Sequence, residues 1–453
     1  MSRLFGTDGV RGRANLNLTP ELAFKVGRAH AYQIIQNPQL QRGGRPQVVV
    51  GRDTRLSGQL LQYGYTCGLM SLGVQPLVLG VIPTPGVAWS IRRYGAQGGC
   101  VISASHNPYY DNGLKLVGAD GYKLTDAQED QLERLVAESK DLPRAVDENL
   151  ATCQDLTSAQ GEYGAYVRSL AKTRLEGLKI VLDCANGAAS ALAEPIFSSL
   201  GAQVTLLHAS PDGININAQC GSTHPQTMQA KVVELGADLG LAFDGDADRC
   251  LACDERGEMI DGDHMLLLFA KWLQKDGLLP QNRLVTTVMA NLGLEEACAR
   301  HGLDMVRTAV GDRYVLEEMR RSGATLGGEQ SGHIIFLNYS TTGDGLVTGL
   351  VLSQILKERQ APLSQLAAAV EKKPQYMVNV RVRDKYTWSE PQPVAEAVAQ
   401  VEESLRGRGR LLVRPSGTEN VVRVMAEGPD AQELRQLVDS IAAALELHYA
   451  PEA

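Results

Sequence analysis

The stretch that decides the fold is Leu239-Gly240-Leu241-Ala242-Phe243-Asp244-Gly245-Asp246-Ala247-Asp248-Arg249. Its first five residues are apolar and read as a short buried strand, and its last six place three carboxylates at alternate positions. Open α/β sheets bind their ligands at the carboxyl ends of the strands, where such polar loops lie. Three alternating carboxylates on a tight turn suit Mg²⁺, which takes few protein ligands and keeps positions open for phosphate oxygens.

A second apolar run, Cys100-Val101-Ile102, leads into the polar loop Ser103-Ala104-Ser105-His106-Asn107-Pro108. A serine that carries phosphate, next to a metal that neutralises the charge, is a phosphoryl-transfer arrangement. Two plainer interpretations stay open at this point. A Ser-His pair in a loop is often a simple turn. Counted from Asp244, the aspartate run also matches an EF-hand loop as far as Glu255, although Arg249 stands where that loop needs glycine.

Composition describes an ordinary globular protein. The 453 residues are 44% hydrophobic and 21% charged, and they exceed what one core can organise, so we expect about three or four domains. A net charge of −8 argues against nucleic acid as a partner. No stretch approaches a membrane span, and the N-terminal residues lack a signal-peptide core. The eight cysteines form no dense framework, and Cys250 and Cys253 lack a second pair, which favours free thiols in a reducing cytoplasm.

Apolar β-like runs alternate with helical stretches in three successive regions, which predicts α/β layers. We expect domains over residues 1–154, 155–257, 258–372 and 373–453, the last one α+β. A helix should begin at Pro20 with Thr19 as N-cap, another near Ser57, and a third should cover Asp430 to Leu447. The expected strands are Gln47–Val50, Pro76–Leu79, Gly99–Ile102, Lys179–Leu182, Gln203–Leu207, Leu239–Phe243, Arg283–Val288, Met305–Thr308, Ala324–Gly327, His333–Phe336, Met377–Val382, Arg410–Val413 and Val421–Ala426.

Two further loops near the chain's beginning offer groups for an anion. The loop Phe5 to Gly12 has three glycines and Arg11, so that backbone and guanidinium could approach a phosphate; a plain glycine turn is the alternative. Lys115 follows Asn112-Gly113 and could reach back to the serine as proton shuttle or phosphate partner. On its own, a lysine after Asn-Gly is more often a solvated hairpin residue.

Two later loops offer groups for a sugar phosphate. Glu329 and Ser331 in the loop that ends at His333 could bind sugar hydroxyls, and His333 could shuttle a proton unless it is a satisfied turn histidine. The segment Arg414 to Asn420, with Arg423 beyond it, offers an arginine fork, hydroxyls and a glycine, which are the parts of a phosphate cradle.

One more acidic run resembles a metal site. Asp261-Gly262-Asp263-His264 opens an apolar helical stretch, where acidic residues serve as caps and complement the helix dipole. We therefore expect a structural use for Asp261 and Asp263.

These loops, in this order and over essentially the whole chain, resemble the α-D-phosphohexomutase superfamily. The segments that carry the resemblance are Phe5–Gly12, Gly51–Arg55, Ser103–Pro108, Asp183–Ala188, Asp244–Arg249, Val310–Tyr314, Gly328–His333, Thr341–Gly345 and Arg414–Glu419.

The resemblance implies four domains around a central cleft: three mixed α/β units and a smaller α+β C-terminal domain. It implies that glucosamine 6-phosphate and glucosamine 1-phosphate are interconverted through phosphoserine at Ser105 and a glucosamine 1,6-bisphosphate, which also acts as activator. The partners implied are a phosphosugar, and an activating kinase or bisphosphate donor for Ser105; a homodimer stays open. By the resemblance, one Mg²⁺ is held by phospho-Ser105, Asp244, Asp246 and Asp248, and the reacting centre is lined by Arg11, Lys115 and His333. The sugar hydroxyls are bound by Glu329 and Ser331. The non-reacting phosphate is bound by Arg414, Ser416, Gly417 and Thr418. We add His106, Arg249 and Arg423 as substrate contacts.

Two residues depart from the family pattern. Ala247 stands where many relatives have glycine, which affects only a backbone constraint, and Asn420 stands where relatives usually have proline, which could loosen the phosphate loop.

Three alternative functions stay open: a phosphomannomutase or phosphoglucomutase of the same superfamily, a metal-dependent phosphatase, and a non-catalytic sugar-phosphate sensor. The presence of Ser105, the three aspartates and the cradle together argues against the sensor.

Overall fold

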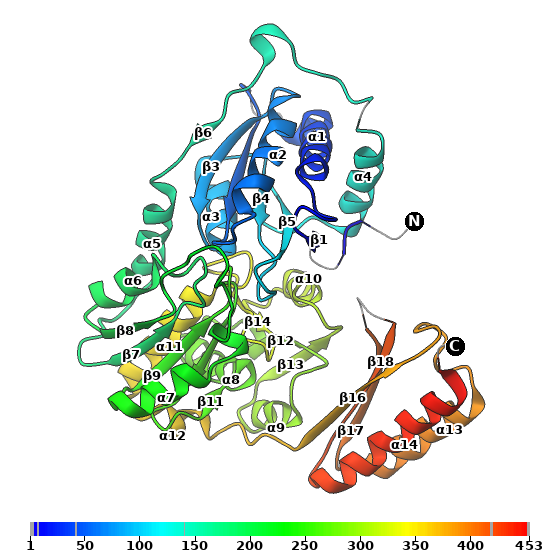
Figure 1. The fold of residues 1–453 in the computed structure, drawn as a ribbon. Helices are drawn as coiled ribbons and strands as arrows, with labels where there is room; N and C mark the ends of the chain where they lie inside the picture. Colours follow the sequence, from blue (N-terminus) through cyan, green and yellow to red (C-terminus); the bar gives the residue numbers. More distant parts are fainter. Residues whose placement is uncertain (1–3, 7–8, 41–42, 140, 417–419, 451–453) are drawn as a thin grey trace. The chain divides into compact units, whose positions relative to one another are not determined.

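A computed structural model describes residues 4–6, 9–40, 43–139, 141–416 and 420–450 of the protein. The chain forms two compact units, of which the first comprises residues 1–289 and 302–369, and the second residues 290–301 and 370–453. Three sheets lie in the first unit and one in the second. Figure 1 shows the order of the elements along the chain. Among the described residues, no helix combines the length and the apolar character needed to cross a bilayer.

The first sheet holds six strands in the order β1-β5-β4-β2-β3-β6. Their bounds are Val10–Arg13 (β1), Gln47–Arg52 (β2), Gln75–Val81 (β3), Gly98–Ile102 (β4), Asp111–Gly118 (β5) and Gln154–Asp155 (β6). Strands β3, β2 and β4 run parallel and are nearly continuous apolar segments, as expected for strands covered on both faces. The expected strands at 47–50, 76–79 and 99–102 are therefore confirmed. Strands β1, β5 and β6 are not among the expected strands. In β5, Asn112 and Gly113 lie inside a strand that returns antiparallel to β4.

Helices of the first domain begin where the sequence predicts. Helix α1 (Pro20–Gln36) has Thr19 as N-cap, whose side chain accepts a hydrogen bond from the Leu22 amide, and α2 (Gly58–Met70) follows Ser57. Helices α3 (Thr84–Tyr94) and α4 (Asp126–Ala137) complete the layers around this sheet.

The second and third sheets repeat the parallel pattern. The second has the order β11-β10-β9-β7-β8, with β7 (Lys179–Asp183), β8 (Gln203–Leu207), β9 (Leu239–Phe243), β10 (Cys250–Cys253) and β11 (Met259–Ile260). The third has the order β13-β12-β14-β15, with β12 (Arg283–Thr287), β13 (Asp304–Thr308), β14 (Leu326–Gly328) and β15 (Ile334–Phe336). Helices α5 (Ala159–Ser169), α6 (Ala193–Ser199), α7 (Gln226–Leu235), α8 (Gly262–Lys275), α10 (Asp312–Ser322) and α11 (Gly345–Arg359) pack with them. The expected strands here are confirmed to within two residues at each end.

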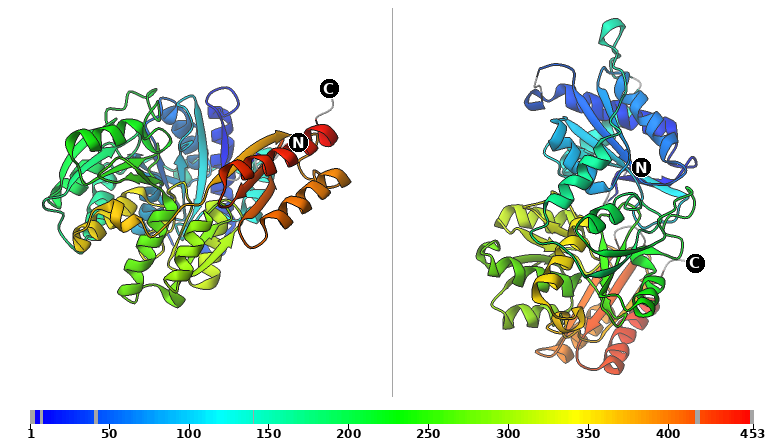
Figure 2. Two further views of the ribbon diagram at one scale, coloured as in Figure 1. Left: turned by 90° about the horizontal axis from the view of Figure 1, so that it is seen from below. Right: turned by 90° about the vertical axis from the view of Figure 1, so that its left-hand side faces the viewer.

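The second unit is built on an antiparallel sheet in the order β16-β18-β17. Strands β16 (Gln375–Arg381), β17 (Arg410–Pro415) and β18 (Val421–Glu427) carry α13 (Gln392–Leu405) and α14 (Ala431–Tyr449) on one face, as two further views in Figure 2 show. Val422 and Val424 of the sheet pack against Leu434, Val438 and Ile441 of α14 in one apolar core. Helix α9 (Leu292–Arg300) is grouped with this unit. The fold class of three α/β domains and a smaller C-terminal α+β domain is confirmed.

The contact between α1 and α2 depends on glycine, and this gives a prediction about stability. A Cβ at Gly68 would lie 2.2 Å from the carbonyl oxygen of Phe24, so Gly68→Ala must push the two helices apart. We expect a loss of about 1–3 kcal/mol in the free energy of unfolding. Gly161→Ala, on the open face of α5, is the control and should stabilise by roughly 0.5–1 kcal/mol, because alanine favours the helix. Denaturant unfolding measures the free energy of unfolding of both variants. Equal changes in Gly68→Ala and Gly161→Ala would contradict the packing argument.

Candidate active site

Ser105 lies in the loop after β4, and its hydroxyl points at the aspartate loop. Its Oγ donates a hydrogen bond of 2.6 Å to Asp244 Oδ2 and lies 3.3 Å from His106 Nδ1. Its backbone φ is +51°, a left-handed conformation that non-glycine residues adopt rarely and that often marks functional sites. The hydroxyl of the neighbouring Ser103 has other hydrogen-bond partners, because its Oγ accepts from the Ser105 amide at 2.9 Å and donates to Asp53. Of the two serines, only Ser105 presents its hydroxyl to the carboxylates.

A buried arginine holds the serine loop in this conformation. Arg55 is 1% exposed and donates to the carbonyl oxygens of Ser105 and Asn107, both at 2.8 Å, while its Nε pairs with Asp53 at 2.8 Å. Asn217 adds a hydrogen bond of 2.9 Å to the same Ser105 carbonyl. Such a network fixes the loop from behind, because each donor would be costly to leave unpaired in the interior.

These supporting residues were not predicted as part of the site. A signal for Arg55 was present, since Gly51 to Arg55 follows a strand and is one of the segments that carry the family resemblance. No local signal marks Asn217, which reaches the serine loop from a distant loop of the second domain.

The three aspartates after β9 form a compact cluster. One ligand atom from each of Asp244, Asp246 and Asp248 lies within 4.8 Å of the others, and all three side chains are buried. Asp246 Oδ2 accepts from Lys115 Nζ at 2.9 Å and from Thr84 Oγ1 at 2.6 Å. In the part of the chain that the structure describes, Asp246 Oδ1 and Asp248 Oδ1 are buried without a hydrogen-bond partner. Buried carboxylate oxygens that lack donors fit a hard cation with oxygen ligands.

The electrostatics of the cluster agree with that fit. Burial, with the charges of Asp248 and Asp246 beside it, raises the pKa of Asp244 well above its usual range. Burial opposes the ionisation of Asp248 too, but the neighbouring His333 outweighs it and lowers the pKa of that carboxyl. Three acids in one buried cluster repel one another, and a bound cation would relieve the repulsion.

The backbone allows the aspartate loop and the serine loop to touch. A Cβ at Gly245 would lie 2.6 Å from the Ser105 carbonyl oxygen, so only glycine fits between the loops. Ala247 has a φ of +54°, which explains why glycine suits this position in relatives. As expected from the sequence, the departure at Ala247 concerns the backbone alone.

Lys115 and His333 are both buried beside the aspartates. Lys115, in β5, is 3% exposed and paired with Asp246, so the solvated-hairpin alternative is wrong. His333 Nδ1 lies 3.6 Å from Asp248 Oδ1, and its Nε2 accepts from the Gly343 amide at 3.1 Å. Both ring nitrogens face protein groups, which suits a residue that orients Asp248; the proton-shuttle role stays a prediction.

Two arginines act on the histidine beside the serine. Burial, followed by the charges of Arg249 and Arg11, lowers the pKa of His106 to about 4, so this imidazole is neutral at pH 7. For Arg249, burial lowers the guanidinium pKa, but the carboxylates of Asp248 and Asp244 outweigh it and raise that pKa. A neutral imidazole and two guanidinium charges thus act near a hydroxyl that we expect to carry phosphate.

The loop between β14 and β15 brings sugar-binding candidates to the same place. Glu329 Oε1 accepts from the Gly311 amide at 3.2 Å, and its charge reaches Arg249. Ser331 Oγ is buried and has no hydrogen-bond partner among the described residues, so its hydroxyl is available to a ligand. The first unit therefore joins the serine, aspartate and sugar loops in one site.

The phosphate-cradle residues lie in the second unit. Arg414 and Arg423 are direct partners across β17 and β18, and burial together with Arg423 lowers the pKa of Arg414. Within the described part of the chain, Arg423 Nε is buried without a hydrogen-bond acceptor. Ser416 is 2% exposed. Two arginines that face each other across neighbouring strands bring two guanidinium charges together, which suits an anion. Gly417 and Thr418 lie outside the described residues.

Asn420, which stands where relatives usually have proline, is itself held by hydrogen bonds. Its side chain donates to the carbonyls of Val382 at 2.8 Å and Arg383 at 3.0 Å, and accepts from the Lys385 amide at 3.2 Å. Residues 417–419 of the adjoining loop lie outside the described residues, so the expected effect of Asn420 on that loop stays a prediction.

The other acidic candidates are structural. Asp261 caps α8, accepting from the His264 amide, and Asp263 Oδ2 accepts from Gln330 at 3.0 Å, so the helix-start interpretation is confirmed. The aspartate run joins two strands rather than two helices, which excludes an EF-hand.

Comparisons with known proteins agree with this architecture. Four models of the phosphoglucomutase/phosphomannomutase family match: alpha/beta/alpha domain I at residues 2–142, domain II at 162–257, domain III at 261–373 and the C-terminal domain at 377–444. A phosphoglucosamine mutase of Moorella thermoacetica is 54% identical, over 97% of this chain and 98% of its own.

Solved structures show the same fold. A phosphoglucomutase/phosphomannomutase family protein of Burkholderia thailandensis is 26% identical, with a TM-score of 0.82 over 99% of this chain and 98% of its own. An N-acetylphosphoglucosamine mutase of Aspergillus fumigatus, solved with GlcNAc-6P and magnesium, is 18% identical, with a TM-score of 0.68 over 98% of this chain and 95% of its own. At that identity it supports the fold alone.

The chain therefore belongs to the phosphoglucomutase/phosphomannomutase family, and it is a phosphohexomutase, an enzyme of the isomerase class. Within that family it belongs with the phosphoglucosamine mutases, with which it shares about half of its residues over nearly its full length.

Proposed function

We propose that the enzyme interconverts glucosamine 6-phosphate and glucosamine 1-phosphate through a phosphoserine at Ser105. The bond between Ser105 Oγ and phosphorus breaks, a bond between the free sugar hydroxyl oxygen and phosphorus forms, and the proton of that hydroxyl is passed to Ser105 Oγ, which yields glucosamine 1,6-bisphosphate. That intermediate turns over and returns its other phosphoryl group to Ser105. The observation that carries this proposal is the Ser105 hydroxyl held 2.6 Å from Asp244, beside the buried Asp246 Oδ1 and Asp248 Oδ1, neither of which accepts a hydrogen bond from a described residue.

We propose that Asp244, Asp246, Asp248 and phospho-Ser105 hold one Mg²⁺. When bound, the ion would neutralise charge that builds up on the transferred phosphoryl group. Lys115 orients Asp246, His333 orients Asp248, and Arg55 fixes the serine backbone. Arg11, His106 and Arg249 contact the phosphosugar. Glu329 and Ser331 bind its hydroxyls.

We propose that Arg414, Ser416, Gly417, Thr418 and Arg423 hold whichever phosphate is not reacting. A mutase must keep its intermediate through a half-turn, so one cradle has to accept both the 1- and the 6-phosphate. The cross-strand arginine pair in the second unit supports this role. The boundaries of the four domains at 154, 257 and 372 belong to the same proposal, as does first phosphorylation of Ser105 by a kinase or by a bisphosphate.

The substrate is tested by a coupled assay with glucosamine 6-phosphate, mannose 6-phosphate and glucose 6-phosphate under equal conditions. We expect kcat/KM to be highest for glucosamine 6-phosphate. Equal or higher values for the mannose or glucose phosphates would favour the phosphomannomutase or phosphoglucomutase function. Release of inorganic phosphate in place of isomerisation would favour a phosphatase.

The cradle is tested by Arg414→Ala, which removes a bidentate donor to phosphate. Loss of one charged, partly desolvated phosphate contact costs on the order of 2–4 kcal/mol, so kcat/KM should fall by about 30- to 1,000-fold in both directions. Release of bisphosphate should rise, while phosphorylation of Ser105 is less affected. Arg414→Lys should rescue only in part, since a point charge lacks the fork. Wild-type kinetics without bisphosphate release in Arg414→Ala would exclude this loop as the cradle.

All eight cysteines are free thiols in the structure. On that ground we propose that the enzyme works in a reducing compartment, the cytoplasm.

A further inference from the structure

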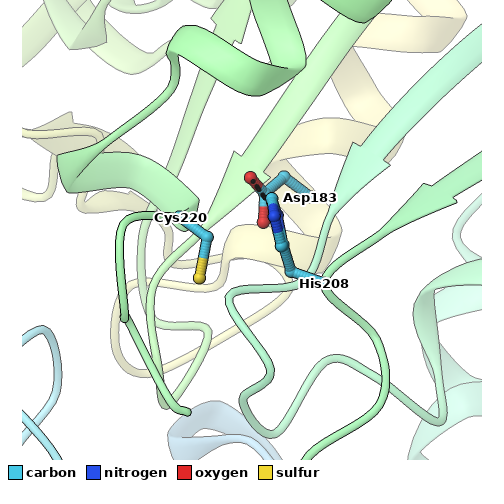
Figure 3. A group of neighbouring side chains, drawn as sticks. All are labelled: Asp183, His208 and Cys220. Carbon is cyan, nitrogen blue, oxygen red and sulfur yellow. Dashed lines mark hydrogen bonds and ion pairs between the residues drawn. The ribbon is translucent and has the colours of Figure 1, made fainter.

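A second group of metal-ligating side chains lies in the second domain, apart from the three aspartates. Asp183 ends β7, His208 follows the neighbouring parallel strand β8, and Cys220 comes shortly before α7. Figure 3 shows Asp183 and His208 in contact, with the Cys220 side chain beside them. One ligand atom from each lies within 4.8 Å of the others.

The distances allow one ion to bind all three residues. Three atoms within 4.8 Å of one another share a point about 2.8 Å or less from each, against bond lengths of about 2.0–2.3 Å for zinc. Side-chain shifts of under about an ångström would therefore complete the coordination. The ligand set of thiolate, imidazole and carboxylate suits a borderline-soft divalent ion such as Zn²⁺ and is poorly suited to Mg²⁺.

The cluster is built into its surroundings. Asp183 is fully buried, and its carboxylate accepts from the Ala185 amide at 2.9 Å and the Gly221 amide at 3.0 Å, contacts of the kind that orient metal ligands. His208 Nδ1 lies 3.0 Å from Asp183 Oδ2, and the backbone φ values at His208 and Ala185 are both positive. Cys220 is fully buried.

We propose that Asp183, His208 and Cys220 bind one Zn²⁺-like divalent ion, with water or another small ligand in the fourth position. Binding converts the Cys220 thiol to a thiolate and releases its proton to solvent. The ion would clamp the segment 208–220 to the end of β7. That segment includes Asn217, whose amide donates to the Ser105 carbonyl at 2.9 Å, so the clamp supports the serine loop from behind.

Co²⁺ serves as the probe, because a cobalt–thiolate bond gives a charge-transfer absorption that oxygen ligands do not. The purified full-length enzyme, stripped of metal and reduced, is titrated with Co²⁺ in excess Mg²⁺, which keeps the aspartate site occupied. We expect one equivalent of the thiolate band in wild type, and competition by Zn²⁺. Cys220→Ser should abolish the band, and His208→Gln should weaken cobalt affinity by about a hundredfold. Cys67→Ser, which removes an exposed thiol elsewhere, is the matched control and should keep the band.

Thermal melts make the test independent of folding defects. Zn²⁺ should raise the melting temperature of wild type and of Cys67→Ser by several degrees in excess Mg²⁺, and leave that of Cys220→Ser unchanged. Absence of the band in wild type, or a band that persists at full strength in Cys220→Ser, would overturn the proposal and leave an Asp-His hydrogen bond that only anchors the turn.

Discussion

Replacement of Ser105 by alanine is expected to abolish isomerisation, because it removes the hydroxyl that we propose carries the enzyme's phosphoryl group. Only Ser105 directs its hydroxyl at the carboxylates, whereas Ser103 is held by Asp53 and by the Ser105 amide. Covalent group transfer cannot proceed without its nucleophile, so we expect a loss of at least about 10⁴-fold in kcat. The coupled isomerase assay measures it.

The control separates chemistry from structure. Ser103→Ala removes a buried hydroxyl from the same loop and should cost about 1–3 kcal/mol of stability while keeping a phosphorylatable Ser105. Ser105→Ala removes a hydroxyl that is also buried and hydrogen-bonded to Asp244, so it should cost a similar amount, about 1–3 kcal/mol, and the two variants should differ in turnover rather than in stability. Retention of near-wild-type turnover by Ser105→Ala, with activity lost in Ser103→Ala instead, would reverse the assignment of the two serines.

Replacement of Asp244 by asparagine is expected to have opposite effects on stability and activity. In the metal-free protein, burial and the two neighbouring aspartates disfavour its ionised form, as the raised pKa of Asp244 indicates. Removing that charge should leave the melting temperature in a chelator unchanged or higher. The same change removes a ligand from the proposed Mg²⁺ site, so the stabilisation by Mg²⁺ should vanish and kcat should fall by about 10²- to 10³-fold.

Asp261→Asn is the matched control, because Asp261 belongs to the other acidic run and asparagine also caps helices well. It should keep both the response to Mg²⁺ and the rate. Melts with Mg²⁺ and with chelator, together with kcat at saturating Mg²⁺, check both variants. An Asp244→Asn enzyme that still gains stability from Mg²⁺, or an Asp261→Asn enzyme that loses it, would place the metal elsewhere.

The sequence predicts the parallel strands well, because a strand buried on both faces consists of a short run of apolar residues, such as Leu239 to Phe243. It fails at β5, where Asn112-Gly113 is a common hairpin-turn pair but here lies within a strand. Lys115 is buried because it lies in that strand, so the residues around it in the sequence do not predict its ion pair with Asp246.

The residues that carry the site's chemistry can be predicted from the sequence more readily than the residues that hold their loops in place. Ser105 and the three aspartates stand in contiguous loops after apolar runs, where the sequence shows them together. Arg55 and Asn217 bond the Ser105 carbonyl from 50 and 112 residues away in the chain, through contacts that no local pattern encodes. The left-handed conformation of Ser105 likewise arises from those tertiary contacts and not from the residue's own preference.

We propose that the phosphoryl group resides on Ser105 during turnover. The enzyme is incubated with labelled glucosamine 1,6-bisphosphate, and its intact mass and phosphopeptides are measured before and after glucosamine 6-phosphate is added. We predict one phosphate per chain, located on Ser105, and transfer of that label to sugar phosphate at a rate no slower than kcat. Turnover without phosphate on Ser105, or with the phosphate on another residue, would contradict the account.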